Sequence, residues 1–138
     1  MKSSQESIII RIVARLLIPF VQLFGLYVIM HGHGSPGGGF QGGVILGASF
    51  ILYGIAYGVD AVKERFNFRR LTIFTSLGVI IYAGIGLVCL LLGANFLNYG
   101  ILPIPLPRSM GMFGIEIGVG FTVMSVMVSL YYDLIQFK

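Results

Sequence analysis

Residues 31–59 have the sequence HGHGSPGGGFQGGVILGASFILYGIAYGV, a glycine-rich stretch that leads directly into an apolar one. The apolar half, residues 44–59, does not alternate apolar and polar side chains as a strand of a membrane barrel would. Backbone N–H and C=O groups in lipid must be satisfied within their own element, and a helix meets that requirement. The stretch therefore predicts a membrane-spanning helix that is entered through a run of glycines.

The composition of the whole chain also indicates that lipid surrounds most of it. Of its 138 residues, 57% are hydrophobic and 10% are charged, whereas soluble proteins carry about 25% charged residues. The net charge of +4 is not laid along a helix face or interleaved with aromatic side chains, so a nucleic-acid partner is not expected. We expect an integral membrane protein whose main surroundings are the lipid bilayer.

Four apolar segments are long enough to cross a membrane. A bilayer core about 30 Å thick takes about 20 residues of helix. The segments are residues 8–30, 42–59, 71–94 and 110–135. The fold class is therefore expected to be all-α, with four transmembrane helices in a single domain over residues 1–138.

The basic residues are divided unequally between the two sides of such a protein. The N-terminus, the connection at 60–70 and the C-terminus share one side, which holds eight of the nine Lys and Arg residues. The other side holds Arg108. Because basic residues accumulate in cytoplasmic segments, both termini are expected in the cytoplasm. Residues 31–43 are then expected at the outer face of a multi-pass protein of the cell membrane.

The glycine-rich stretch carries two patterns that suggest ligands. Gly32-x-Gly34-x-x-Gly37 matches a dinucleotide fingerprint, but that site needs a preceding strand and a βαβ unit, so no nucleotide is expected. His31 and His33 supply two imidazoles where a stable metal site takes three or four ligands, so no metal or other cofactor is expected. Two interpretations of the histidines stay open: a proton-handling role in an ion path, or capping of the first span in water.

A third interpretation is that residues 31–43 provide a backbone shape. Glycines allow close backbone approach, and non-helical backbone is tolerated at membrane depth only where protein or a water-filled cavity covers it. Phe40 and Gln41 are the sizeable side chains of the run, and we expect them to fill a neighbour's pocket and to make an amide contact. The stretch is thus expected to be a tightly packed turn or re-entrant loop against helices of partner subunits.

Glycines also recur at four-residue spacing within the spans. The pairs are Gly43 and Gly47, Gly54 and Gly58, and Gly114 and Gly118. Small residues at this spacing let membrane helices approach closely. One chain of four helices is not expected to use all of these faces, which favours a subunit of a larger assembly; the alternative is that Gly is simply frequent in membrane helices.

Charged residues inside the expected spans include Glu116, Arg11 and Arg15. Glu116, about two turns from the outer end of the fourth span, is a candidate for a cation or proton path; the alternatives are snorkelling to the interface or pairing with a neighbouring subunit. Arg11 and Arg15 are four residues apart and share one face of the first helix near its inner end. They are expected to contact lipid phosphates or an acidic partner surface.

The segment GHGSPGGGFQGG, residues 32–43, lies between the first two of four expected membrane helices and resembles the signature of the MnhB family, small membrane subunits of the Mrp-type multisubunit Na⁺/H⁺ antiporters. The likeness covers nearly the whole chain. It implies a small non-catalytic subunit, not an enzyme, that assembles with large antiporter-like subunits; lining of the Na⁺ path is a further expectation. The resemblance implies an assembly and ion-path role for Ser35, Pro36, Gly37, Gly38, Gly39, Phe40, Gln41, Gly42 and Gly43.

Two other functions stay open. Related subunits occur in the Mrp-like modules of membrane-bound hydrogenases and sulfane reductases, so the chain is alternatively the equivalent subunit of a redox-driven ion pump. A stand-alone exporter that acts as a homo-oligomer is disfavoured. Such a protein is expected to carry an essential carboxylate in an early span, and the first three spans have no acidic residue in their interiors.

Overall fold

The structure is a computed structural model that describes residues 2–32, 34 and 37–137, with residues 2–5 described in their backbone alone. It contains four long helices: α1 (Lys2–Met30), α2 (Gly39–Tyr57), α4 (Phe68–Leu91) and α5 (Pro107–Gln136). The short helix α3 (Val59–Arg65) follows α2, and the 3-10 turn η1 (Tyr99–Ile101) precedes α5. Each of the four long helices is long and apolar enough to cross a membrane. The predicted all-α fold with four spans is confirmed.

The start of α2 differs from the expectation. The second span was expected from about residue 42, but α2 begins at Gly39, so the last five residues of the glycine-rich stretch are helical. Gly is a poor helix former because it loses much conformational freedom. In α2 the backbone of these glycines packs directly against the neighbouring helices, as described below, and this contact offsets the weak local preference.

The third and fourth spans also begin earlier than expected. The side chain of Asn67 accepts a hydrogen bond of 2.9 Å from the backbone N–H of Arg70, which caps α4 and brings part of the basic connection into the helix. Pro107 opens α5, a position where the missing N–H of proline has no helical partner to lose.

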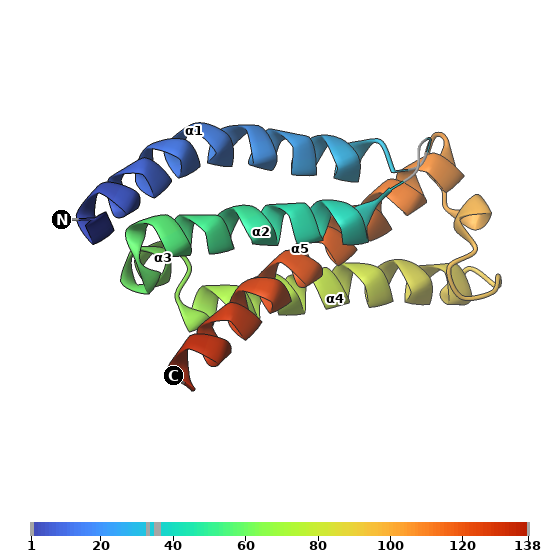
Figure 1. The fold of residues 1–138 in the computed structure, drawn as a ribbon. Coiled ribbons are helices and arrows are strands. Elements are labelled where there is room, and N and C mark those ends of the chain that lie inside the picture. Colours follow the sequence, from blue (N-terminus) through green and yellow to red (C-terminus); the bar gives the residue numbers. More distant parts are fainter. Residues whose placement is uncertain (1, 33, 35–36, 138) are drawn as a thin grey trace.

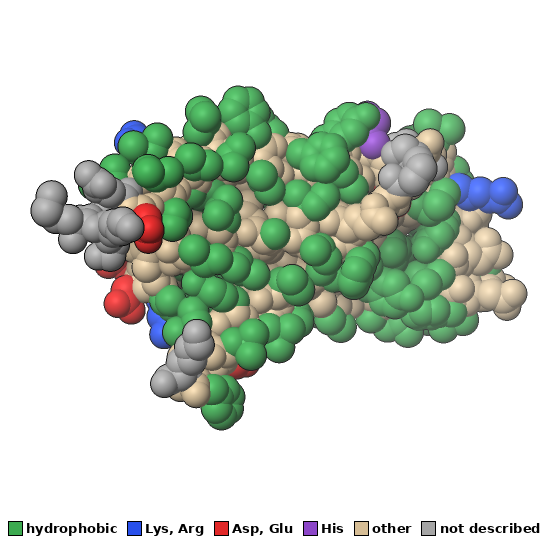
Figure 2. Space-filling model, in the orientation of Figure 1, with side chains coloured by type: hydrophobic (Ala, Val, Ile, Leu, Met, Phe, Trp, Pro, Cys, Tyr) green, Lys and Arg blue, Asp and Glu red, His purple; other side chains and the backbone are tan. Residues whose placement is uncertain are grey.

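The long helices form a row in the order α1, α2, α5, α4 (Figure 1). The two central helices, α2 and α5, pack on each other, α1 packs on α2, and α4 packs on α5. The outer helices keep large apolar side chains exposed, such as Phe20 on α1 and Ile80 on α4. Hydrophobic side chains spread along the face seen in Figure 2. A surface of this kind requires lipid or other membrane helices around it.

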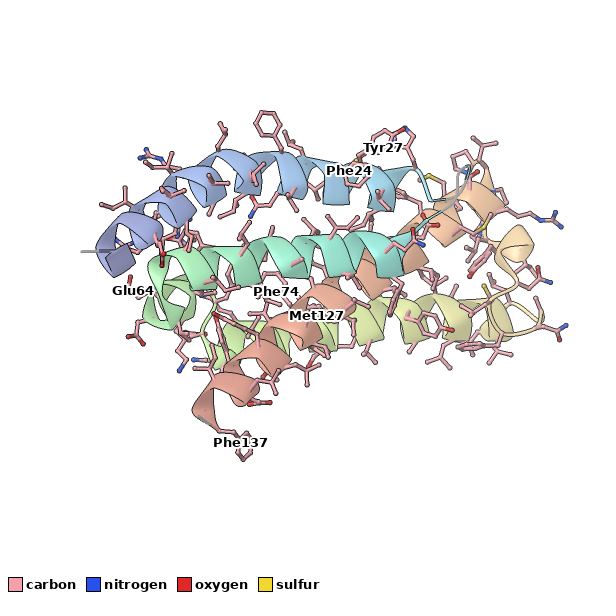
Figure 3. All side chains as sticks on the ribbon, viewed as in Figure 1. Phe24, Tyr27, Glu64, Phe74, Met127 and Phe137 are labelled. Atoms are coloured by element: carbon pink, nitrogen blue, oxygen red, sulfur yellow. The ribbon has the colours of Figure 1, made fainter. Side chains whose placement is uncertain are left out.

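Both termini and α3 lie at one end of the row, and the α1–α2 connection and residues 92–106 lie at the other (Figure 1). On the face seen in Figure 2, the Asp and Glu side chains gather at the end with the termini. Glu64 of α3 and Phe137, next to the C-terminus, are labelled at that end in Figure 3. An even number of spans predicts this arrangement, because the chain then ends on the side where it began.

The helix α3 is anchored to the end of the bundle. The chain turns out of α2 at Gly58, whose φ of 95° favours glycine. Val62 of α3 is buried in a cluster with Leu71, Val128 and Tyr132, and the Tyr132 hydroxyl donates a hydrogen bond of 2.9 Å to the carbonyl of Phe66. The connection at 60–70 is therefore a folded element that packs on the end of the bundle.

The two central helices run in the same direction. Four glycines of α2 contact residues of α5 that lie the same number of positions further along the chain: Gly39 contacts Glu116, Gly43 contacts Gly120, Gly47 contacts Met124, and Gly54 contacts Tyr131. Met127 also packs on Gly47, and Figure 3 shows it beside α2. This constant register over most of α2 means that the glycines form one continuous face, which α5 covers.

Candidate functional site

The turn between α1 and α2 packs around Glu116, in the third turn of α5. A Cβ atom on Gly39 would collide with the carbonyl oxygen of Glu116 and would lie 2.8 Å from its carbonyl carbon. A Cβ atom on Gly32 would lie 2.5 Å from the carboxylate oxygen Oε1 of Glu116 and 2.6 Å from the Cα of Gly38. The turn therefore has glycine at 32 and 39 because the backbone and side chain of Glu116 occupy the space that other side chains need.

Gly42 and Gly43 pack the same turn closely against other helices of this chain. A Cβ atom on Gly42 would collide with Cγ1 of Ile29 and would lie 2.8 Å from the carbonyl oxygen of Gly25, both in α1. A Cβ atom on Gly43 would lie 2.7 Å from the carbonyl oxygen of Gly120 in α5. The glycines were expected to accommodate the backbone of a partner subunit. Within this chain, α1 and α5 fill the space beside Gly42 and Gly43, so the close backbone approach at these two positions is to helices of the same chain.

Phe40 and Gln41 face away from this contact. Phe40 is 64% exposed, and Gln41 is also exposed, whereas Gly39, Gly42 and Gly43 are buried. One turn of α2 thus has a glycine side that is buried within the chain and a side with two large, exposed residues. The Oε1 atom of Gln41 lies beside Gly37, where a Cβ atom would be 2.9 Å from it.

The carboxylate of Glu116 lies near the start of α2. Gly38, the N-cap of α2, makes no side-chain capping bond, and a Cβ atom on it would lie 3.5 Å from Oε1 of Glu116. The first N–H groups of a helix have no acceptor within it, and their partial positive charge favours a nearby anion. The other carboxylate oxygen, Oε2, is buried. Glu116 is thus half-buried, and its carboxylate lies beside the N-terminus of α2.

The Glu116 charge also acts on the connection between α4 and α5, residues 92–106. Tyr99 in η1 packs on Gly111 of α5, where a Cβ atom would lie 2.7 Å from Cδ1 of the Tyr99 ring. Burial raises the pKa of the Tyr99 phenol above its ordinary value of 10.0, and the charges of Tyr82, Cys89 and Glu116 raise the pKa further. Burial is thus the largest cause of the raised pKa of Tyr99, and Glu116 is the smallest of the four contributors.

The structure describes one of the two candidate histidines, His31. The ring of His31 is exposed, stacks on Tyr27 with the ring centroids 4.2 Å apart, and has its Nδ1 atom 3.2 Å from the carbonyl oxygen of Tyr27. This contact places His31 beside the C-terminal end of α1. His33, Ser35 and Pro36 lie outside the described residues. Among the described residues, no group of three His, Cys, Asp or Glu side chains is arranged to hold a metal ion.

Arg11 and Arg15 are both exposed, but one of them has a partner within the chain. The Nε–H of Arg11 donates a hydrogen bond of 3.1 Å to the carbonyl oxygen of Ala56, in the last turn of α2. Carbonyl groups in the last turn of a helix lack an N–H partner within it, so this bond ties the end of α2 to α1. Arg11 and Arg15 remain candidates for lipid or partner contact.

Sequence reasoning did not find the close contact between α4 and α5. A Cβ atom on Gly78 would collide with Oγ1 of Thr122 and with the carbonyl oxygen of Gly118. The Thr122 hydroxyl donates a hydrogen bond of 3.0 Å to the carbonyl of Gly118 within α5. Gly118 had been noted for its spacing, but Gly78 has no second glycine four residues away in α4, so the spacing rule gave no signal for it.

Comparison with known proteins identifies relatives along nearly the full chain. A family model described as a domain related to the MnhB subunit of the Na⁺/H⁺ antiporter matches residues 9–129. A Staphylococcus haemolyticus protein named "Putative antiporter subunit mnhB2" is 32% identical over 137 residues, which cover 94% of this chain and 95% of the relative. A Staphylococcus aureus (strain Newman) protein of the same name is 31% identical with the same coverage.

Proposed function

Because the chain belongs to the family of domains related to the MnhB subunit of Na⁺/H⁺ antiporters, we propose that it is a non-catalytic membrane subunit of a multisubunit antiporter of this kind. The resemblance seen in residues 32–43 is confirmed by this membership. The relatives that cover nearly the whole chain are named as antiporter subunits. The observation that carries the proposal is the match over residues 9–129, which includes all four spans in large part.

The charges of the described helices support a role beside a transport machinery. A proton or cation carrier needs ionisable groups along its path through the membrane. In the described part of the spans, Glu116 is the carboxylate that lies well inside a helix, and glycines of the same chain pack against it. The complete path for H⁺ is therefore assigned to partner subunits, and this chain acts as a supporting subunit and not as an enzyme.

A finer part of the proposal concerns Na⁺. The Glu116 carboxylate, His31 and the glycine turn lie together at one end of the molecule, and a carboxylate inside a membrane helix is a functional candidate by default. We place this end of the chain beside the Na⁺ path of the complex. Glu116→Gln keeps the shape of the side chain and removes its charge. It therefore separates a role of the charge in Na⁺ transport from a role of the side chain in packing. Reduced Na⁺-dependent transport in an intact complex supports the path, and unchanged transport assigns Glu116 to packing alone.

The redox-driven alternative is not favoured by the relatives, whose names refer to antiporters. The host complex can be identified directly by native purification of the tagged full chain. Partner subunits with antiporter sequences support the proposal, and partners that hold nickel–iron or iron–sulfur centres select the respiratory alternative. A native mass that shows only copies of this chain would instead support the stand-alone exporter.

The proposed location is the cell membrane, with both termini in the cytoplasm. The termini and α3 share one end of the molecule, and the segments that meet at that end carry eight of the nine basic residues. The positive-inside tendency assigns this end to the cytoplasm.

The transport assay that tests the function compares two preparations in proteoliposomes. The intact complex is expected to exchange Na⁺ for H⁺, and the purified chain alone is expected to give no exchange. The proposal of a supporting subunit fails if the chain alone exchanges the two ions.

A further inference from the structure

The ends of α4 and α5 that lie next to their connection enclose two adjoining hollows of opposite character. The apolar hollow, with a volume of about 430 Å³, is lined by one side of residues 80–88 of α4, by Met110 of α5 and by Leu102 of the connection, among others. The polar hollow, with a volume of about 360 Å³, includes Arg108 and Ser109 in its lining. We propose that an anionic phospholipid binds here, with its phosphate at Arg108 and one acyl chain in the apolar hollow.

The two hollows are continuous because the same elements line both. Residues 106–109 line the polar hollow, and the next two residues of α5 line the apolar one. In the connection, Gly100 belongs to the polar hollow and Leu102 to the apolar one. Arg108 and Gly111 are three residues apart and therefore lie on the same side of α5. A molecule with a charged head and an apolar tail can occupy both hollows at once.

The apolar hollow lies at the depth of acyl chains. The spanning helix α4 has 24 residues, a length of about 36 Å, which exceeds the bilayer core by about 6 Å. Even if this whole excess projects beyond the core at the Leu91 end, residues 80–87 remain within the core. The part of α4 that lines the hollow is therefore surrounded by hydrocarbon and not by water.

The shape of this space favours a lipid over a partner helix. The helices α4 and α5 touch at Gly78 and Gly118, and they diverge from there toward the connection that joins their ends (Figure 1). A transmembrane helix is about 10 Å wide and continues to the membrane surface, so the connection, with Leu102 in the lining of the hollow, would block its path. A lipid ends at its headgroup. Its acyl chain extends toward the bilayer centre, which is the order in which the two hollows follow each other.

The charge of Arg108 requires an anion from outside the chain. Arg108 is exposed, and no carboxylate pairs with it in the part of the chain that the structure describes. Glu116 lies eight residues further along α5, a rise of about 12 Å. The other four acidic residues belong to segments at the opposite end of the molecule: Glu6, Asp60, Glu64 and Asp133.

The donors of the polar hollow fit a phosphate group. A guanidinium group donates two parallel hydrogen bonds to phosphate oxygens, and the hydroxyl of Ser109 can donate a further one. The first N–H groups of α5, which begins without a side-chain cap, add partial positive charge. A headgroup with a net negative charge neutralises Arg108, whereas the choline of phosphatidylcholine brings a second cation to the same place.

Photolabelling of the intact complex in vesicles tests the site. Two probes carry the same diazirine on one acyl chain, one with a phosphatidylglycerol head and one with a phosphatidylcholine head. Labelled peptides that contain residues 80–88 are quantified by mass spectrometry. The phosphatidylglycerol probe is expected to label them about fivefold more, the factor that corresponds to about 1 kcal/mol for one basic side chain at an anionic lipid surface. Equal labelling by the two probes overturns the inference, because lipid that merely surrounds the helices shows no such preference.

Two competitors separate a lipid from a free phosphate ion. Excess unlabelled phosphatidylglycerol is expected to reduce the labelling, and inorganic phosphate is expected to leave it unchanged. Competition by inorganic phosphate would mean that the polar hollow binds a phosphate ion without a lipid. Absence of labelling by both probes in the intact complex would mean that protein covers the hollow, and it likewise overturns the inference.

Variants of Arg108 test the charge. Arg108→Gln is expected to bring the ratio of the two probes close to one, and Arg108→Lys is expected to retain most of the preference. The matched control is Arg69→Gln, because Arg69 is an exposed arginine at the opposite end of α4. An equal change of the ratio in Arg108→Gln and Arg69→Gln would assign the preference to the overall charge of the chain and would remove Arg108 from the site.

Gly84 allows a test of the apolar hollow. Gly84 lines this hollow, and a Cβ atom on it meets nothing within 4 Å. Gly84→Leu therefore extends into the space of the acyl chain and not into the protein, whereas a single methyl group leaves most of the hollow open. The leucine variant is expected to lose most of the labelling by both probes while its size-exclusion profile stays that of the wild type. Unchanged labelling in this variant would show that the acyl chain lies elsewhere. The measurement reports lipid binding alone, so its result is independent of the proposed transport function.

Discussion

Gly39 of α2 lies directly on the backbone carbonyl group of Glu116 in α5. Two helices from opposite halves of the chain meet at this point, and the contact occurs where the glycine-rich turn becomes a helix. The same pairing continues along α2 through Gly43, Gly47 and Gly54. The glycine-rich motif is therefore the first turn of a long internal helix–helix interface, and its position determines where the exposed Phe40 and Gln41 lie.

Gly39→Ala is expected to destabilise the protein, because the added methyl group meets a backbone carbonyl that cannot rotate away. Overpacking of this kind costs about 1–3 kcal/mol. The measurement is the temperature at which the purified chain or complex loses its monodisperse peak in size-exclusion chromatography, and a clear decrease is expected.

The matched control for Gly39 is Gly34→Ala. Gly34 lies in the same turn, and a Cβ atom on it meets nothing within 4 Å. The temperature should stay close to that of the wild type. Equal decreases for both variants would mean that the turn tolerates no side chain for reasons other than the Glu116 contact.

Gly32→Ala and Glu116→Ala are expected to be coupled. The methyl group at 32 meets the end of the Glu116 side chain at 2.5 Å, so Glu116→Ala makes room for it. The Cα of Gly38 at 2.6 Å stays in place, so the double variant is expected to recover part of the loss. The measurement is a double-mutant cycle on the same transition temperature, in which contacting residues show a coupling of about 0.5–3 kcal/mol.

The corresponding cycle with Gly39 distinguishes side-chain from backbone contact. Gly39→Ala meets the carbonyl group of Glu116, which any residue at 116 retains. Glu116→Ala is therefore expected to give no recovery in the Gly39→Ala background. If Glu116→Ala restored the transition temperatures of Gly32→Ala and Gly39→Ala to the same extent, the result would contradict the geometry described for the turn.

Gly78→Ala is expected to separate α4 from α5. The new methyl group would collide with the Thr122 hydroxyl and with the backbone of Gly118, and small residues at such crossings carry much of the packing in membranes. The comparison is Gly84→Ala in the same helix, where a Cβ atom meets nothing within 4 Å. Limited proteolysis of the connection at 92–106 should be faster in Gly78→Ala and unchanged in Gly84→Ala. Equal rates for the two variants would be inconsistent with a close α4–α5 contact at Gly78.

The orientation of the chain is tested by labelling of single cysteines in cells. Cys89 is buried, and Cys89→Ala provides a background without thiols. Glu64→Cys in α3 and Ile104→Cys in the connection at 92–106 are both at exposed positions. A membrane-impermeant maleimide is expected to label position 104 in intact cells and position 64 only after the membrane is opened. The reverse pattern would place the termini outside the cytoplasm.

The amino-acid sequence alone determined that the chain lies in a lipid bilayer, how many spans it has and which family it resembles. Hydropathy and segment length are properties of local stretches measured against lipid, so they predict that a helix crosses the membrane and approximately where it ends. The motif in residues 32–43 was sufficient for the resemblance, which the match over residues 9–129 confirms. The sequence also showed that Glu116 lies within the fourth span, because it falls between the ends of the apolar segment 110–135.

The tertiary structure decided which surfaces the glycines face. Spacing along one helix shows that two glycines share a side, but it contains no information on whether the covering helix comes from the same chain or from another. The rotation and register of α2 against α5 depend on two segments remote in sequence, so the pairing of Gly39 with Glu116 is a property of the packed helices. The same packing turns Phe40 and Gln41 away from α5, because residues one and two positions after buried Gly39 lie about 100° and about 200° around the helix from it.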